Sequence, residues 1–133
     1  MRTLLTLTIF LLATFPWPAN ASSVNSAELE RCLEEAINEG ALINVHRMEC
    51  LKAELKKQDG QLNAIYRTRM SQVKPDEKKW LQEAQRQWIV YRDAWCRYEK
   101  SLVDMPPNIY VNELFCLVEL TFQQVQRLKQ TAP

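Results

Sequence analysis

The feature that most constrains the fold is a run of twenty residues, Trp80 to Glu99, that contains neither glycine nor proline. It holds three of the four tryptophans and two of the four tyrosines. Its apolar residues recur at the three- and four-residue steps of one helix face: Leu81, Ala84, Trp88, Tyr91, Trp95 and Tyr98. Because so much aromatic surface is costly to leave in water, we expect the rest of the chain to cover this face and to bury Trp88 and Trp95.

Two helices are predicted before the aromatic one. The first starts at a cap on Asn25, where Glu28 can return the hydrogen bond, and ends at Gly40. The second begins at Asn44 and passes through Asp59, which stands where the apolar stripe calls for an apolar residue. A carboxylate at such a position needs a buried partner or local access to water, and the sequence leaves both alternatives open.

The aromatic helix opens at Pro75, a residue favoured in the first turn, and should run to about Lys100. Pro106 and Pro107 cannot continue it, and Asn108 can cap a last helix. No segment alternates apolar and polar residues with the period of two that marks a half-buried strand. The sequence therefore predicts an all-α protein of four helices.

Four cysteines allow three pairings, and helical hairpins favour one of them. Cys32 and Cys50 are equidistant from Ala41, beside the first predicted turn, and Cys96 and Cys116 are equidistant from Pro106. Residues equidistant from the turn of an antiparallel hairpin face each other. We therefore expect two hairpins, each pinned by a disulfide, Cys32–Cys50 and Cys96–Cys116, and each worth about 3 kcal/mol in the chain-entropy model.

Residues 1–21 have the pattern of a signal peptide. Arg2 is followed by the apolar run Leu4 to Phe15, and Ala19-Asn20-Ala21 is a small-x-small cleavage site. The mature protein would then be a single domain, residues 22–133, with no membrane segment after cleavage. A leader together with an even number of cysteines indicates export to an oxidising compartment outside the cytoplasm.

Composition and motifs argue against several classes of function. The chain has 17 basic and 16 acidic residues without a clustered basic excess, so no nucleic-acid partner is expected. The Lys52–Lys57 stretch is predicted to be a solvated helix face, in which Glu54 and Lys57, or Lys52 and Glu49, are at pairing distance. The cysteines lie far apart and His46 is the only histidine, so neither a metal nor a cofactor is expected. Catalytic signatures are missing from the sequence, which predicts a protein that is not an enzyme.

Several polar residues near the aromatic stripe have two interpretations. In an enzyme they would hold a substrate or a metal. We favour a structural role, in which Arg92 pairs with a carboxylate such as Asp59 while Asn63 and Gln85 satisfy groups between helices, because an unpaired buried carboxylate is costly. On that interpretation Asp59→Ala should destabilise the protein strongly.

The segment around the double proline is the better candidate for contact with a partner. Stiffened by its prolines and tethered by a disulfide, it would lose little entropy on binding. Its candidate contact residues are Asp104, Met105, Asn108 and Tyr110. Trp80, at the start of the aromatic helix, is a further candidate at the rim. The alternative is that the segment only connects two helices.

Two blocks of residues resemble one known family. They are D-x-x-L-N-x-x-Y over Asp59 to Tyr66 and Q-R-x-W-x-x-Y-R-D-x-x-C over Gln85 to Cys96, set within the cysteine order. The pattern, from about Glu28 to Leu128, is similar to the LprI-like lysozyme inhibitor N-terminal domain family. The resemblance implies a small exported helical protein with paired cysteines, located in a bacterial periplasm or, as the alternative, secreted. It also implies that the motif residues are structural: Asp59, Asn63, Tyr66, Gln85, Trp88, Arg92 and Asp93.

The resemblance also implies a function. The first hypothesis is a non-catalytic binding protein that occludes the cleft of a lysozyme or another peptidoglycan hydrolase. Asp104 or an acid on a helix would then face the basic rim of that enzyme. The second hypothesis is a structural or accessory protein of the envelope with no hydrolase target. The sequence decides neither the target nor the oligomeric state.

Overall fold

The computed structural model describes residues 26–106 and 108–131. Four α-helices and one short 3-10 turn make up nearly all of this part of the chain, which contains no strand. In chain order they are α1 (Ala27–Ile37), η1 (Gly40–Leu42), α2 (Ile43–Gln72), α3 (Pro75–Ser101) and α4 (Asn108–Gln130). The predicted all-α class is confirmed.

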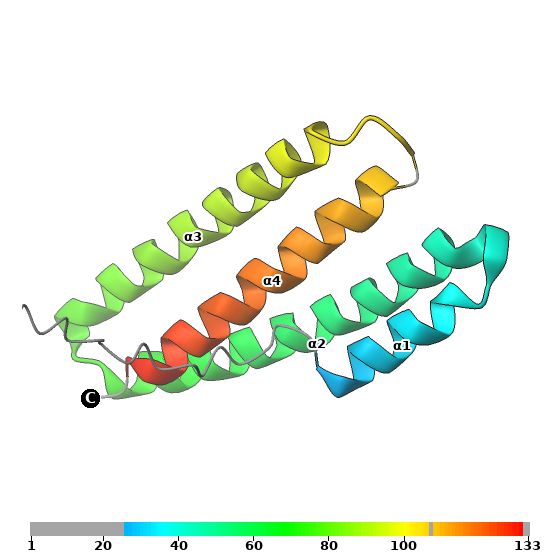
Figure 1. Ribbon diagram of the computed structural model, residues 1–133. Coiled ribbons are helices and arrows are strands. Elements are labelled where there is room, and N and C mark those ends of the chain that lie inside the picture. Colours follow the sequence, from blue (N-terminus) through cyan, green and yellow to red (C-terminus); the bar gives the residue numbers. More distant parts are fainter. Residues whose placement is uncertain (1–25, 107, 132–133) are drawn as a thin grey trace, which may run out of the picture.

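The helices form two antiparallel hairpins, as predicted. Figure 1 shows α1 folded back along the first half of α2, and α3 folded back along α4. The hairpins meet where α4 packs along α2, and these two helices run in the same direction (Figure 1). In consequence α4 lies between α2 and α3, while α1 and α3 lie on the outside of the array.

Each hairpin is closed by the disulfide that the sequence predicted. Cys32 and Cys50 join α1 to α2, with a Cα–Cα distance of 5.8 Å. Cys96 and Cys116 join α3 to α4, with a Cα–Cα distance of 5.4 Å. Both distances are typical of disulfides, so each bridge fits helices that already pack side by side.

The helix ends have local causes. Ser26 is the N-cap of α1, since its Oγ accepts a hydrogen bond from the backbone N–H of Leu29 at 3.1 Å. The cap predicted at Asn25 lies outside the described residues. α1 ends at Ile37, and Gly40, with a φ of 55°, starts the turn to α2. At the start of α3, the Glu77 carboxylate accepts a hydrogen bond from the Lys74 backbone N–H at 2.9 Å.

The apolar core consists of two clusters. One lies among α1, α2 and α4 around Leu29, Leu51 and Val118, each almost fully buried. The other lies among α2, α3 and α4 around Leu62 and Val125. Burying one such side chain contributes about 1.5–3 kcal/mol. The clusters therefore hold α4 against α2 along its whole length, and α3 is attached mainly through α4.

The prediction that the rest of the chain covers the aromatic stripe is wrong for most of its length. Tyr91, Trp95 and Tyr98 are 52%, 42% and 53% exposed, so the expected burial of Trp95 is wrong as well. Cys96 is the reason. Successive residues of an α-helix lie about 100° apart around its axis, so turning Cys96 toward its disulfide partner on α4 turns Trp95 toward solvent. The side of α3 that packs inward carries Leu81, Gln85, Trp88, Arg92 and Cys96.

Candidate functional site

The motif residues meet in a groove between α2 and α3. Asp59, Asn63 and Tyr66 follow one another at four- and three-residue steps along α2 and so share one side of it. Across the groove α3 contributes three more motif residues at similar steps. Together they border a cavity of about 370 Å³. The α3 residues are Gln85, Trp88 and Arg92.

Arg92 is the centre of this groove. Its Nη1 lies 3.3 Å from Asp59 Oδ1 and donates to Thr121 Oγ1 at 3.2 Å, while its Nε donates to Asp93 Oδ1 at 2.9 Å. The guanidinium carbon also lies 5.2 Å from the centre of the Trp88 ring. One cation thus links all three long helices, and the predicted pair of Arg92 with Asp59 is present.

Two expectations about this groove need correction. The Asp59 side chain is 43% exposed, so it reaches water as well as Arg92 and is not a buried carboxylate. Asn63 is exposed and forms no hydrogen bond within the described chain, so it does not satisfy groups between helices. Gln85 does have the expected role, since it is buried and accepts a hydrogen bond from Gln124 Nε2 of α4 at 2.9 Å.

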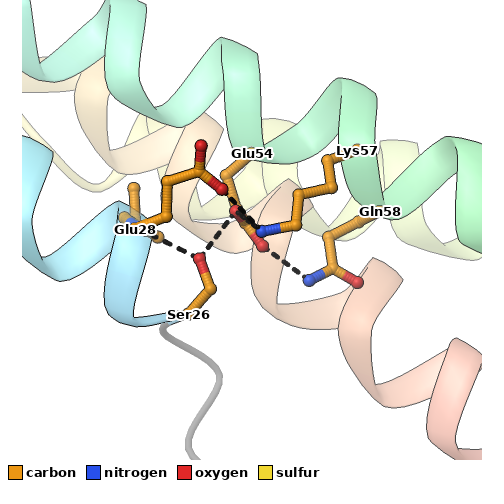
Figure 2. Close-up of polar contacts among 6 residues, drawn as sticks. Ser26, Glu28, Glu54, Lys57 and Gln58 are labelled. Atoms are coloured by element: carbon orange, nitrogen blue, oxygen red, sulfur yellow. Dashed lines mark hydrogen bonds and ion pairs between the residues drawn. The ribbon is translucent and has the colours of Figure 1, made fainter.

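Among the residues that the structure describes, the buried carboxylate is Glu54, which the sequence analysis placed on a solvated face. Its side chain is only 3% exposed. Figure 2 shows its two oxygens between α1 and α2. Oε2 accepts hydrogen bonds from Ser26 Oγ at 2.9 Å and from Lys57 Nζ at 3.4 Å, and Oε1 accepts from Gln58 Nε2 at 2.7 Å. The predicted pairing with Lys57 is therefore present, but on a buried carboxylate.

The Glu54 cluster ties the start of α1 to the middle of α2. Ser26 both caps α1 and donates to Glu54 (Figure 2). Lys57 also donates to Glu28 of α1 at 3.0 Å, and this hydrogen bond is the main cause of a pKa of Lys57 above its usual 10.5. The sequence did contain a signal: Glu54 is four residues after Cys50, and a disulfide cysteine faces the neighbouring helix.

A second cavity, of about 390 Å³, lies near the carboxyl ends of α2 and α4. Arg69 and Leu128 border it together with Leu81 and Trp88 of α3. The buried Arg69 donates to the backbone oxygens of Leu128 at 2.7 Å and Lys129 at 2.9 Å. These carbonyls belong to the last turn of α4, so Arg69 caps this helix end, and its positive charge is favourable near the negative end of the α4 dipole.

A group with metal-ligating atoms occurs elsewhere, at the first disulfide. The ligand atoms of Cys32, His46 and Cys50 lie within 4.8 Å of one another. The two sulfurs are bonded to each other, so they offer no thiolate to an ion. This cluster is therefore part of the α1–α2 brace.

The predicted contact residues do not form one surface. Asp104, Met105, Asn108 and Tyr110 are all exposed at the connection between α3 and α4, and Met105 is 66% exposed. Trp80, 67% exposed, lies near the other end of α3. At 1.5 Å per residue, about 32 Å of helix separates it from Ser101, the last residue of α3. A partner that binds the connection therefore does not reach Trp80 unless it extends along the whole of α3.

Fold and site together define a class: small all-α domains braced by two disulfides, whose charged motif residues pair between helices. Within it, the chain belongs to the LprI family of lysozyme inhibitors, because a model of that family, described as "Lysozyme inhibitor LprI", matches residues 32–128. This match spans both disulfides and the motif groove. Neither the curated proteins nor the solved structures contain a match to the chain.

Membership of this family implies a lysozyme inhibitor that acts by binding and not by catalysis. A domain of this family with two disulfides also indicates an exported protein. Over the described residues, no helix has both the length and the apolar character needed to cross a membrane.

Proposed function

We propose that this protein inhibits a lysozyme or another peptidoglycan hydrolase by entering its substrate cleft with the connection between α3 and α4. The mature protein would be a single domain starting at Ser22, and it would act in the periplasm. The observation that carries the proposal is an exposed segment bearing one carboxylate, Asp104, and held between two helices that a disulfide joins. Family membership supplies the class of target.

The connection is well suited to enter a cleft because both of its ends are fixed. The disulfide Cys96–Cys116 holds α3 to α4 behind it. Lys100, near the end of α3, forms an ion pair with Glu113 of α4 at 2.6 Å, and its Nζ lies 4.5 Å from the Tyr110 ring centre. A segment fixed in this way loses little conformational entropy when it binds.

The side chains at the connection provide both apolar and charged contacts. Leu102 and Met105 are 62% and 66% exposed, and burying them in a cleft would contribute free energy through removal of apolar surface from water. Asp104 supplies a negative charge that can face the basic rim common in lysozymes. Because the chain as a whole is close to neutral, long-range attraction is modest, and affinity would depend on contacts at short range.

The test is a titration of cell-wall lysis by a panel of lysozymes with the oxidised protein. We expect one or more panel members to lose activity at stoichiometric amounts of inhibitor. Asp104→Lys should weaken that inhibition by about tenfold or more, since it turns an attractive contact into a repulsive one worth at least about 1.4 kcal/mol. The matched control is Glu119→Lys, the same change of charge at an exposed position of α4.

Two results would contradict the proposal in different ways. Equal loss of inhibition with Asp104→Lys and Glu119→Lys would show that the connection is not the contact surface. Absence of inhibition across the panel, even at large excess of a correctly oxidised protein, would reject the inhibitor function. The second hypothesis, an accessory protein of the envelope, would then be preferred.

A further inference from the structure

The exposed face of α3 has the sequence period of a helix–helix interface. Six positions separated by alternating steps of four and three residues follow one line along the helix, which is the heptad spacing of coiled coils. We call this line the α3 seam: Trp80, Ala84, Gln87, Tyr91, Ala94 and Tyr98. All six residues are exposed, and the three aromatic ones are 67%, 52% and 53% exposed.

None of the residues that the structure describes covers the seam, since all six of its members are exposed. In Figure 1, α3 lies at one edge of the array with α4 on one side only. The residues that α3 turns inward, among them Gln85 and Cys96, belong to a different line around the helix. Contiguous apolar surface of this kind usually marks an interaction site.

We propose that the occupant is the seam of a second copy of the chain, with the two α3 helices antiparallel. In that arrangement large side chains of one seam pack against large side chains of the other, and alanine packs against alanine. Trp80 packs against the partner's Tyr98, Ala84 against the partner's Ala94, and Gln87 against the partner's Tyr91. The two small layers let the helix backbones approach closely. This inference goes beyond inhibition and does not depend on it.

The charges beside the seam favour this orientation. Glu83 and Arg97 lie on the same flank of α3, on either side of Val90. The antiparallel pairing of the seams places Glu83 beside the partner's Arg97, twice by symmetry, whereas parallel helices in register would place these two residues on opposite flanks of the interface. Within the described residues, Arg97 has no ion pair, and Glu83 accepts only a hydrogen bond from Gln87. Both charges are therefore available to a partner.

The aromatic residues near the seam are already ordered by one another. The rings of Tyr91 and Trp95 are stacked with centres 6.1 Å apart, and Tyr98 lies 5.6 Å from Trp95. Trp95 Nε1 also donates to Glu99 Oε1 at 2.7 Å. Side chains ordered in this way lose less entropy when an interface forms.

The available area indicates a dimer of moderate strength. A fully buried aromatic side chain covers about 150–250 Å², so the half-exposed aromatic residues of the seam together with Trp95 supply up to about 500 Å² per protomer. The total of about 1,000 Å² is the lower limit for a specific interface. We therefore expect a dimer that dissociates in the micromolar range.

The test is sedimentation of the oxidised protein over a range of concentrations up to a few hundred micromolar. The wild type should shift from monomer to dimer. Tyr91→Glu should raise the Kd at least about tenfold by placing a charge in the seam. Val45→Glu, which changes an exposed apolar residue of α2, is the matched control and should leave the Kd unchanged.

A charge exchange tests the orientation. Glu83→Arg alone and Arg97→Glu alone should each weaken the dimer, because each places like charges together. An equimolar mixture of the two variants should associate as the wild type does, since both ion pairs form again in the mixed dimer. These positions are exposed, and circular dichroism of each variant verifies that its helices are intact.

A protein that stays monomeric throughout this range would overturn the proposal. So would a dimer that ignores both Tyr91→Glu and the charge exchange, because its interface would lie elsewhere.

Discussion

Replacing Glu54 with alanine should cost this small domain a large share of its stability. The change removes a carboxylate that accepts three hydrogen bonds and lies almost out of contact with water. Hydrogen bonds to a charged group contribute about 1.5–3 kcal/mol each. Part of this lost hydrogen-bond energy is offset in the variant, because a charged carboxylate no longer has to be removed from water. We expect a net loss of about 2–4 kcal/mol in the free energy of unfolding.

Most of that loss should arise from Gln58. Its side chain is buried, and its Oε1 has no hydrogen-bond partner among the described residues. Without Glu54 its Nε2 would lose its acceptor too, and a buried unsatisfied group costs about 1–3 kcal/mol. Glu54→Ala and Gln58→Ala should therefore be less than additive, since the double variant removes the stranded amide together with its partner.

Urea denaturation of the oxidised protein, followed by circular dichroism, measures these free energies. The control is Glu49→Ala, an exposed glutamate on the same helix, which should change stability by no more than about 0.5 kcal/mol. If Glu54→Ala cost no more than Glu49→Ala, the buried cluster would not stabilise the fold. If the losses of unfolding free energy for Glu54→Ala and Gln58→Ala were fully additive, the unpaired Gln58 amide would not explain the effect of Glu54→Ala.

Three further predictions use the same denaturation assay. Arg92→Ala should cost about 2–3 kcal/mol and Asp59→Ala only about 1, because Arg92 joins three helices whereas Asp59 is partly solvated; equal costs would contradict this. Replacing both cysteines of the α3–α4 disulfide with serine should lower the free energy of unfolding by about 3 kcal/mol. An unchanged free energy of unfolding would show that this disulfide does not stabilise the hairpin. The Glu28 carboxylate raises the pKa of Lys57 above 10.5, so the stability that Lys57 adds is full below pH 10.5 and declines as pH rises through the folded pKa. The measurement compares wild type with Lys57→Gln. If their difference in unfolding free energy stayed constant as pH rose through the folded pKa of Lys57, the contribution assigned to charged Lys57 would be wrong.

The sequence predicts the helices well because its signals are local. Pro75 starts α3, and the symmetric spacing of the cysteines identifies both hairpins and both disulfides. Each signal lies within one helix or within one hairpin of consecutive helices. Which side of a helix is buried depends instead on its neighbours, and that information is not local.

The aromatic helix shows the difference. Two lines along α3 have helical spacing, one aromatic and one containing Gln85 and Arg92. Hydrophobicity alone selects the first, but the disulfide and the hydrogen bonds to α4 bury the second. Glu54 was missed for a related reason. In sequence it is one charged residue among lysines, and only the approach of α1 removes it from water.

The two proposed surfaces are far enough apart to act independently. The connection lies at one end of α3, while the centre of the seam, near Val90, is about 16 Å along the helix from Ser101. A dimer paired antiparallel along α3 would therefore carry its two connections at opposite ends, both accessible, so that one dimer could hold two enzyme molecules. Tyr91→Glu should weaken dimerisation and leave inhibition per chain unchanged, whereas Asp104→Lys should weaken inhibition and leave dimerisation unchanged. Loss of both properties in either variant would show that dimerisation and inhibition share a surface, which would contradict this division.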